Sequence, residues 1–322
     1  MSFEKYIKNI SKLRTDSGQH RYPALTLHRA PHKPLLLLSV MDLIAQGIIT
    51  ENFIAPSVDL LETFNTYWSL IMPLGSKTTM AYPFPRLQTD GFWHRVTNPG
   101  YDPERNYNVT SMTQLRKIYV GARLDDELFQ YFCKPATREE LRATIIHTYF
   151  APEIRPAVVE QGVINLAAYQ YSQQLLEKVK ESEKAWDQSE ETEKIKKVRD
   201  QGFRKAIVQL YDHRCALCGI RMLTPEGHTI VEAAHIRPWH KSYDDRPING
   251  LALCRLCHWS FDEGLMSVGN NYEVLVSKRV RTDRNIPGHM MTLADRPIFR
   301  PENEIYWPGM ENISWHQKNT FK

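Results

Sequence analysis

The strongest apolar pattern of the chain covers residues 35–44, which are almost all Leu, Val, Met or Ile. Pro34 precedes this segment and Gly47 follows it, so the pattern predicts a core helix with a proline start and a glycine stop. Helical spacing and short apolar runs predict four further elements. These are helices over residues 59–70 and 137–148 and strands over residues 48–54 and 92–96. Together they predict a mixed α+β domain over residues 1–165.

Residues 167–199 have a different pattern. They are polar, intersperse Glu with Lys, and contain neither Gly nor Pro, which favours one long exposed helix. We therefore expect a helical linker over residues 166–200. After Gln201 the pattern changes to short strands and turns, and seven of the twelve histidines follow it. A second domain is expected over residues 201–322, which makes the fold class α+β with two domains.

Composition narrows the function only slightly. A chain of 322 residues is long enough for two domains with their own cores. Hydrophobic residues make up 42% and charged residues 24%, and no apolar run could cross a bilayer. The N-terminus lacks the apolar stretch of a secretory signal, so a cytoplasmic location without a membrane partner is predicted. The net charge of +4 permits nucleic-acid binding without requiring it.

Four of the five cysteines form two CxxC pairs, Cys215 with Cys218 and Cys254 with Cys257. Two such knuckles can supply four thiolates to one tetrahedral zinc ion. Because all four ligands come from the protein, this Zn²⁺ would have no open position for chemistry and would stabilise the fold. Cys133 is left over and is interpreted as an ordinary thiol.

The residues around the knuckles carry a second kind of chemistry. Hydrolysis of a phosphodiester needs an activated water and a cation beside the phosphate. His235 lies on an apolar predicted strand and can take a proton near neutral pH. Asn249 is neutral and cannot be the base. His258 and Asp262 are four apart on a predicted helix, so both can reach one divalent cation such as Mg²⁺, Mn²⁺ or Ni²⁺.

The order His235, Asn249, His258, with the zinc knuckles interleaved, resembles the HNH or ββα-metal endonucleases over about residues 203–268. The resemblance implies that His235 is the general base of a one-metal mechanism. It also implies that Asn249 orients His235 or approaches the metal, and that a helix carrying His258 and Asp262 supplies metal ligands. These three residues of the motif, His235, Asn249 and His258, are the expected catalytic residues.

One position departs from that family. Many HNH proteins place an Asp or His directly before the first histidine as a metal ligand, whereas Ala234 stands there in this chain. Glu232 is the alternative ligand, although strand alternation puts residues 232 and 235 on opposite faces. The expectation is a single-metal site led by His258 and completed by Asp262, the phosphate and water.

Two stretches of the first domain could contact DNA. The first places His28, Arg29, His32 and Lys33 beside the start of the predicted core helix, where a phosphate can be held. The second, residues 82–86, combines aromatic and proline rings with a cation. Taken alone, the residues support either an anion site next to an apolar patch or a buried turn made rigid by its prolines.

The two stretches together resemble the sulfur-binding domain of restriction endonucleases that cut phosphorothioate-modified DNA, over about residues 5–150. The resemblance implies that His28 and Arg29 approach the modified linkage and that Tyr82 and Pro83 form a shallow apolar pocket for the sulfur. Such a pocket penalises the better-hydrated oxygen by desolvation. Some relatives carry a small apolar residue in place of Arg86, so Arg86 either lines the pocket or points at DNA.

The whole chain is therefore predicted to be a modification-dependent, type IV, McrA-like restriction endonuclease. Its expected partner is double-stranded DNA with phosphorothioate linkages, and its expected assembly is a homodimer, because cutting both strands needs two active sites or two visits. Two alternatives stay open. One is an HNH nuclease for methylated or unmodified DNA, and the other is a zinc-stabilised DNA-binding protein without catalysis.

Overall fold

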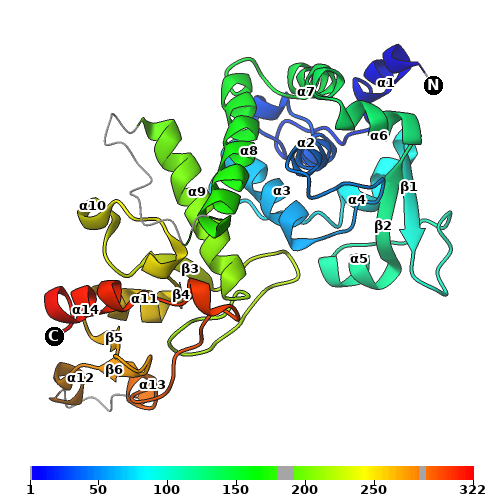
Figure 1. Ribbon diagram of the computed structural model, residues 1–322. Helices are drawn as coiled ribbons and strands as arrows, with labels where there is room; N and C mark the ends of the chain where they lie inside the picture. Colours follow the sequence, from blue (N-terminus) through cyan, green and yellow to red (C-terminus); the bar gives the residue numbers. More distant parts are fainter. Residues whose placement is uncertain (1, 178, 180–191, 283–287) are drawn as a thin grey trace. The chain divides into compact units, whose positions relative to one another are not determined.

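The computed structural model describes residues 2–177, 179, 192–282 and 288–322 (Figure 1). The chain divides into two compact units. The first contains residues 1–166 and 225–228, and the second contains residues 167–224 and 229–322. The chain passes from the first unit to the second within helix α8 (Arg155–Glu177).

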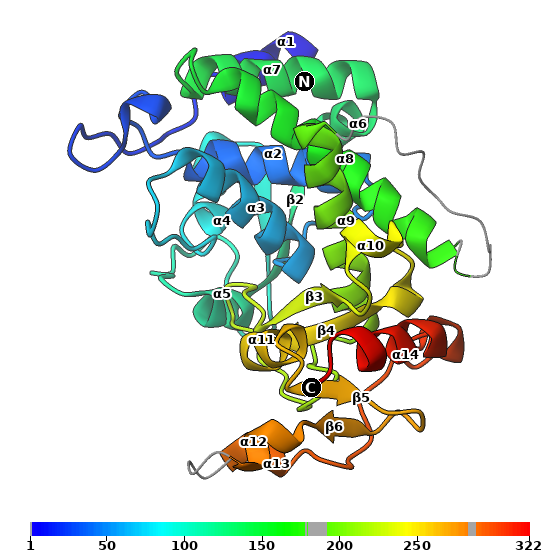
Figure 2. The same ribbon diagram turned by 90° about the vertical axis from the view of Figure 1, so that its left-hand side faces the viewer.

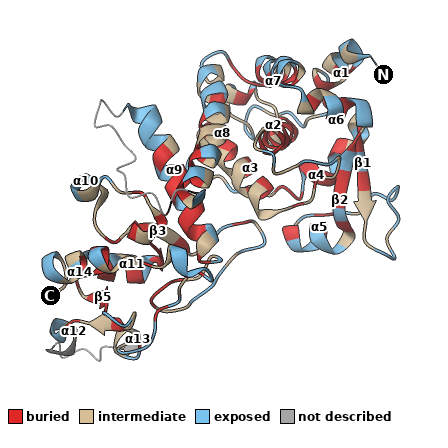
Figure 3. Ribbon diagram, viewed as in Figure 1, coloured by how far each residue is buried: buried red, intermediate tan, exposed pale blue. Residues whose placement is uncertain are grey.

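The first unit is built around α2 (His32–Ala45), which is the predicted core helix. Every residue from Lys33 to Ile44 is buried, and α2 is accordingly buried along almost its whole length in Figure 3. A helix that is apolar on all sides is stable only when other elements surround it. Here α3 (Val58–Ile71) and α7 (Pro135–Tyr149) pack against it, and they cover the predicted segments 59–70 and 137–148.

A two-stranded antiparallel sheet completes this unit, with β1 (Trp93–Thr97) paired to β2 (Tyr119–Leu124). The strand predicted over residues 48–54 is wrong, because only Ile54 pairs there, in an isolated bridge to Ala122. The side chain of Asn52 replaces strand pairing: its amide accepts from the Leu124 backbone N–H and donates to the Leu124 carbonyl.

The remaining elements of the first unit are short. They are α1 (Phe3–Ile10), η1 (Ala24–Thr26), α4 (Pro83–Arg86), η2 (Leu87–Asp90), α5 (Met112–Ile118) and α6 (Asp126–Cys133). The proline-containing segment expected as a loop or turn is thus a short helix. Pro83 occupies its first position, where the missing N–H costs nothing.

The second unit contains an antiparallel hairpin of β3 (Val231–His235) and β4 (Gly250–Cys254), with His235 opposite Gly250. Two helices, α9 (Glu193–Leu210) and α11 (Arg255–Asp262), pack on the hairpin (Figure 2). His235 stacks on Phe203 of α9, whereas Glu232 contacts His258 of α11. Since residues 232 and 235 face opposite sides of a strand, α9 and α11 cover opposite faces of the hairpin.

The other elements of the second unit follow the hairpin or join its strands. They are α10 (Trp239–Ser242), η3 (Pro247–Asn249), β5 (Met266–Val268) paired with β6 (Val274–Val276), α12 (Lys278–Thr282), α13 (Gly288–Met291), η4 (Glu304–Tyr306) and α14 (Met310–Asn319). The C-terminal helix α14 packs against β5.

The exposed linker helix predicted over residues 167–199 needs correction. Apart from residues 179 and 192, its described residues belong to α8 and α9, and residues 178 and 180–191 lie outside the described residues. Tyr171, Ser172 and Arg199 are buried, so these parts pack into the second unit. Helix α9 also continues past residue 201, the predicted start of the second domain, to Leu210. Among the described helices, none has the length and apolar character needed to span a bilayer.

Candidate functional site

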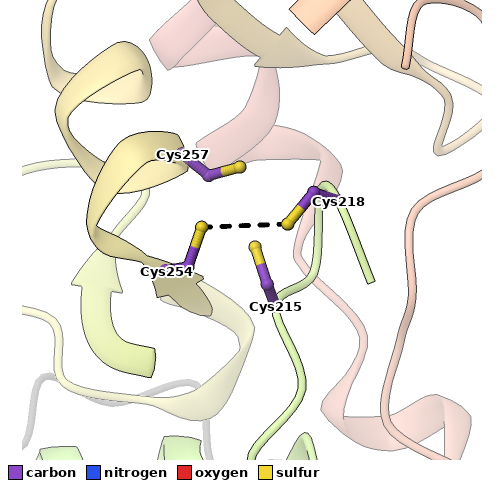
Figure 4. Close-up of side chains that lie close together, drawn as sticks. All are labelled: Cys215, Cys218, Cys254 and Cys257. Carbon is purple, nitrogen blue, oxygen red and sulfur yellow. Dashed lines mark hydrogen bonds between the residues drawn. The ribbon is translucent and has the colours of Figure 1, made fainter. Parts of the chain in front are cut away.

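The four cysteines of the two CxxC pairs converge at one point, with all four sulfur atoms within 4.8 Å of one another (Figure 4). Cys218 Sγ lies 3.7 Å from Cys254 Sγ. Zinc–sulfur bonds of about 2.3 Å in a tetrahedron put two sulfurs about 3.8 Å apart, so the cluster fits a structural zinc ion. Cys254 is the N-cap of α11, and a zinc ion here would therefore hold the start of that helix.

His235 lies at the end of β3 with one face of its ring covered. The imidazole stacks on Phe203, with ring centres 3.9 Å apart and planes 7° from parallel. Its Nε2 atom lies 2.7 Å from Oδ1 of Asp245, and 19% of its side chain stays exposed. His235 is thus held at one nitrogen and one face, while part of its side chain remains open to solvent.

The sequence-based prediction missed Asp245. Its side chain is 1% exposed and also contacts Tyr171 and Arg199. The only signal in the sequence was the Asp244-Asp245 pair in a loop before Asn249. A buried carboxylate needs partners, but nothing in the pattern identified them.

Asn249 is completely buried, and among the described residues none of its side-chain hydrogen bonds goes to the His235 ring. Its amide accepts from the Arg237 N–H at 2.9 Å and donates to the carbonyls of Arg237 and Asp244 at 3.0 and 2.9 Å. These bonds tie together the loop that carries Asp245, whose carboxylate contacts His235. The catalytic role of Asn249 stays a prediction.

His258 lies on α11 between two carboxylates. Its Nδ1 is 3.4 Å from Glu232 Oε2, and its Nε2 is 3.5 Å from Asp262 Oδ2. An imidazole flanked by carboxylates suits Mg²⁺, Mn²⁺ or a later first-row cation. The two carboxylates lie at different ring nitrogens, so one ion on His258 can take only one of them without rearrangement.

His235 and His258 belong to opposite sides of the hairpin, and no hydrogen bond or ring contact joins them among the described residues.

In the first unit, three of the predicted DNA-binding residues come together. The Tyr82 side chain is exposed, with the Arg86 guanidinium 5.5 Å and the His32 ring 6.3 Å from its ring centre. His32 also packs against Trp68 at 4.7 Å. Burial, with the Arg86 charge nearby, lowers the pKa of His32 to about 4. This site therefore combines a neutral histidine, an exposed aromatic ring and one cation.

Two other predicted residues face inward. Lys33 Nζ lies 2.6 Å from Asp90 Oδ2, and both side chains are less than 9% exposed, so the Lys33 charge is neutralised inside the unit. Burial lowers the pKa of Lys33, while Asp90 opposes this effect. Pro83 is buried as well. As they stand, neither presents a contact surface to DNA.

His28 and Arg29 lie on a separate, strained turn. Leu27 and His28 both have positive φ, 52° and 55°, a conformation that costs residues with side chains about 1–3 kcal/mol each. Arg29 donates to Thr15 Oγ1 at 3.0 Å. Among the described residues, no hydrogen bond or ring contact joins His28 or Arg29 to Tyr82.

Comparisons with known proteins bear on both units. Residues 215–269 match the family model of the HNH endonuclease, and residues 4–163 match that of the ScoMcrA-like DNA sulfur-binding domain. No curated protein matches the chain. A solved structure titled "Modification dependent TagI restriction endonuclease" is 21% identical with a TM-score of 0.27, and the match covers 37% of this chain and 38% of that chain. The chain thus aligns to about two fifths of that protein, a likeness too slight to support an argument.

The HNH match, together with the ββα arrangement of β3, β4 and α11, defines the class of this protein as a nuclease. More specifically, the chain carries an HNH endonuclease domain over residues 215–269 and a ScoMcrA-like DNA sulfur-binding domain over residues 4–163.

Proposed function

We propose that this protein is a modification-dependent, type IV restriction endonuclease that binds phosphorothioate-modified duplex DNA and hydrolyses its backbone. The observation that carries the proposal is the presence in one chain of a match to a DNA sulfur-binding domain and a match to an HNH endonuclease. A DNA-binding domain without a nuclease domain would only bind DNA. An HNH domain alone would have little sequence preference, since phosphate contacts carry no base information.

In this proposal His235 is the general base. It takes a proton from a water molecule whose oxygen attacks the phosphorus, and the bond to the leaving ester oxygen breaks. Part of its side chain is accessible to water, while Phe203 shields one face of the ring. A positioned base of this kind contributes about 10²- to 10⁴-fold to a rate.

His258 and Asp262 would hold the divalent cation, with Glu232 as the alternative carboxylate on the other side of His258. When bound, the cation would stabilise negative charge on the phosphate. Arg255 Nε lies 3.5 Å from Glu232 Oε1 and partly neutralises that carboxylate, which favours Asp262 as the ligand.

The sulfur pocket would form at the exposed ring of Tyr82, beside His32 and Arg86. Burial keeps His32 neutral at pH 7, so the pocket offers apolar ring surface with a single positive charge from Arg86. Such a surface suits a large, weakly hydrated sulfur carrying part of the phosphate charge. His28 and Arg29 would approach the same linkage from the strained turn.

The test uses matched duplexes that differ only in one phosphorothioate linkage, incubated with Mg²⁺ or Mn²⁺ and with either wild type or His235→Ala. We expect the wild type to cut only the modified duplex and the variant to bind it without cutting. Equal cutting of both duplexes would contradict recognition of sulfur and favour a nuclease for other DNA. Binding without cutting by the wild type would favour a DNA-binding protein without catalysis.

We further propose that the active form is a homodimer, because breaking both strands needs two active sites or two visits. Light scattering of the protein on modified duplex should give two chains per cut site. A strict monomer that nicks one strand at a time would contradict this assembly.

A further inference from the structure

We propose that Asp245 is a positioning residue that fixes the proton of His235 on Nε2, and that Tyr171 and Arg199 hold the Asp245 carboxylate in place. The inference rests on the proposed function of His235 as a general base. It assigns a role to three residues outside the His-Asn-His order, two of them on the helices α8 and α9.

The Asp245 carboxylate is surrounded by donors in the interior. Oδ1 lies 2.7 Å from His235 Nε2 and 3.3 Å from Arg199 Nη1. Oδ2 accepts from the Tyr171 hydroxyl at 2.9 Å and lies 3.4 Å from the same Arg199 nitrogen. With 1% of the side chain exposed, these groups take the place of water around the charge.

This arrangement determines which nitrogen of His235 carries the proton. A carboxylate paired with a guanidinium is ionised, and an ionised carboxylate can only accept hydrogen bonds. The 2.7 Å contact is therefore an N–H donated by His235 Nε2. In the neutral ring the lone pair then belongs to Nδ1, and we assign Nδ1 as the atom that takes the proton from water.

Further contacts keep the carboxylate and the ring from turning. The Arg199 guanidinium lies 3.9 Å from the centre of the Trp239 ring, and its Nη2 lies 2.7 Å from Asp200. The Phe203 ring holds the plane of the His235 imidazole. Hence the direction of the Nδ1 lone pair is set before any substrate binds, which is the condition for efficient proton transfer.

The role in the reaction follows from the charges. When Nδ1 takes the proton, the new water oxygen–phosphorus bond forms, the ester bond breaks, and His235 becomes an imidazolium. Its Nε2–H still faces the negative carboxylate, which stabilises the positive ring. The leaving oxygen is protonated from solvent. An aspartate in this relation to a histidine base holds its orientation and stabilises the cation without itself taking the proton.

A purely structural role for Asp245, as the counter-charge of Arg199, makes a different prediction. In that case, removal of the Asp245 carboxylate would lower the stability of the second unit but would leave the proton of His235 on Nε2. The decisive measurement is therefore the ring protonation of His235, with cleavage measured separately.

The experiment uses the full chain with Asp245→Asn, labelled with ¹⁵N-histidine, and Asp244→Asn as the matched control. Asp244 sits in the same loop, but its carboxylate pairs with Arg246. In wild type we expect the Nε2–H form of neutral His235, and in Asp245→Asn a mixture of both ring forms. The control should keep the wild-type spectrum and cut modified duplex at a rate within about twofold of wild type.

Single-turnover cleavage supplies the second readout. Asp245→Asn should slow cleavage about 10²- to 10⁴-fold with DNA affinity nearly unchanged. Tyr171→Phe removes only one hydroxyl and should lower the cleavage rate by a smaller factor, about tenfold. It takes the place of Asp245→Asn in the test if that variant does not fold. An unchanged ring form together with near-normal cutting would overturn the proposal. If the wild type does not cut at all, the proposed function fails, while the ring spectra still decide the role of Asp245.

Discussion

Gly250 lies directly opposite His235 in the β3–β4 hairpin, and α9 fills the space that a side chain on Gly250 would need. A Cβ atom on residue 250 would lie 2.8 Å from Cγ1 of Ile207, which is an overlap, and 3.1 Å from Cζ of Phe203. Because Phe203 is the ring that stacks on His235, the absence of a side chain at position 250 allows the close approach of α9 that orients the His235 ring.

Gly250→Ala should therefore destabilise the second unit by about 1–3 kcal/mol, as overpacking does, and should also slow cleavage by moving Phe203. Gly309→Ala is the matched control. The nearest atom to a Cβ at Gly309 lies 3.5 Å away, so no overpacking is expected there. Because Gly309 is the N-cap of α14, where Gly is preferred over Ala, the loss of stability should be at most about 1 kcal/mol. Denaturant unfolding and single-turnover cleavage measure both effects, and equal behaviour of the two variants would contradict the packing argument.

Zinc removal should unfold the second unit. Structural zinc sites of this type contribute roughly 10–16 kcal/mol in apparent binding energy, which is more than a domain of this size can lose. Metal analysis of the purified protein should give one zinc per chain, and Cys257→Ser should lose both the zinc and cooperative unfolding of that unit. Cys133→Ser, at a half-buried thiol outside the cluster, should keep both. Loss of zinc with unfolding unchanged would contradict a structural role.

His316 should make the second unit sensitive to acid. Burial lowers its pKa from 6.5 to about 4, although a hydrogen bond to the Phe261 carbonyl opposes the shift. The folded unit therefore favours neutral His316. Its contribution to stability is complete above pH 6.5 and is lost as the pH falls toward 4, up to about 3 kcal/mol.

The measurement for His316 is the free energy of unfolding at pH 7 and pH 5.5 with zinc present, in wild type and in His316→Gln. The glutamine variant does not titrate, so it should lose about 1 kcal/mol less than wild type over this range. The comparison between the two proteins removes the acid effect on the zinc cysteines, which they share. Equal losses in both would show that His316 does not titrate as expected.

The carboxylate that joins His258 at the divalent cation can be identified from binding alone. We expect His258→Ala and Asp262→Asn each to weaken Mn²⁺ binding about tenfold or more, and Glu232→Gln to have a smaller effect because Arg255 already partly neutralises Glu232. Calorimetric titration with Mn²⁺ measures this without DNA. If Glu232→Gln weakened Mn²⁺ binding more than Asp262→Asn, the cation would instead lie on the Nδ1 side of His258, beside Glu232.

The exposed ring and the cation of the first unit should have separable roles. Tyr82→Ala should reduce the preference for phosphorothioate over unmodified duplex, because it removes apolar surface for the sulfur. Arg86→Ala should weaken binding to both duplexes and reduce the salt dependence by about one charge. Arg105→Ala, an exposed arginine elsewhere in the unit, is the control. Binding isotherms at several salt concentrations measure both effects, and a loss of preference in Arg86→Ala alone would reverse the assignment.

Local patterns of the sequence were sufficient for part of this protein. The helix over residues 35–44 follows from its apolar composition. The zinc cluster follows from two CxxC pairs, because each pair places its thiols together within one turn. His258 and Asp262 lie on one helical face since they are four residues apart. In the helix, in the His258–Asp262 pair and within each CxxC pair the partners are close in the chain, so spacing determines their geometry, whereas the meeting of the two CxxC pairs joins residues 36 positions apart.

Tertiary structure decided the rest. The contact between Tyr171 and Asp245 joins residues 74 positions apart, and the pair of Lys33 with Asp90 joins residues 57 positions apart. No periodicity relates such positions. Which charge is buried and which is left to bind a ligand depends on the packing of distant segments, because burial forces a charged group to find a partner. The sequence by itself therefore determined the kind of chemistry, whereas only the folded chain decided which nitrogen of His235 contacts a buried carboxylate.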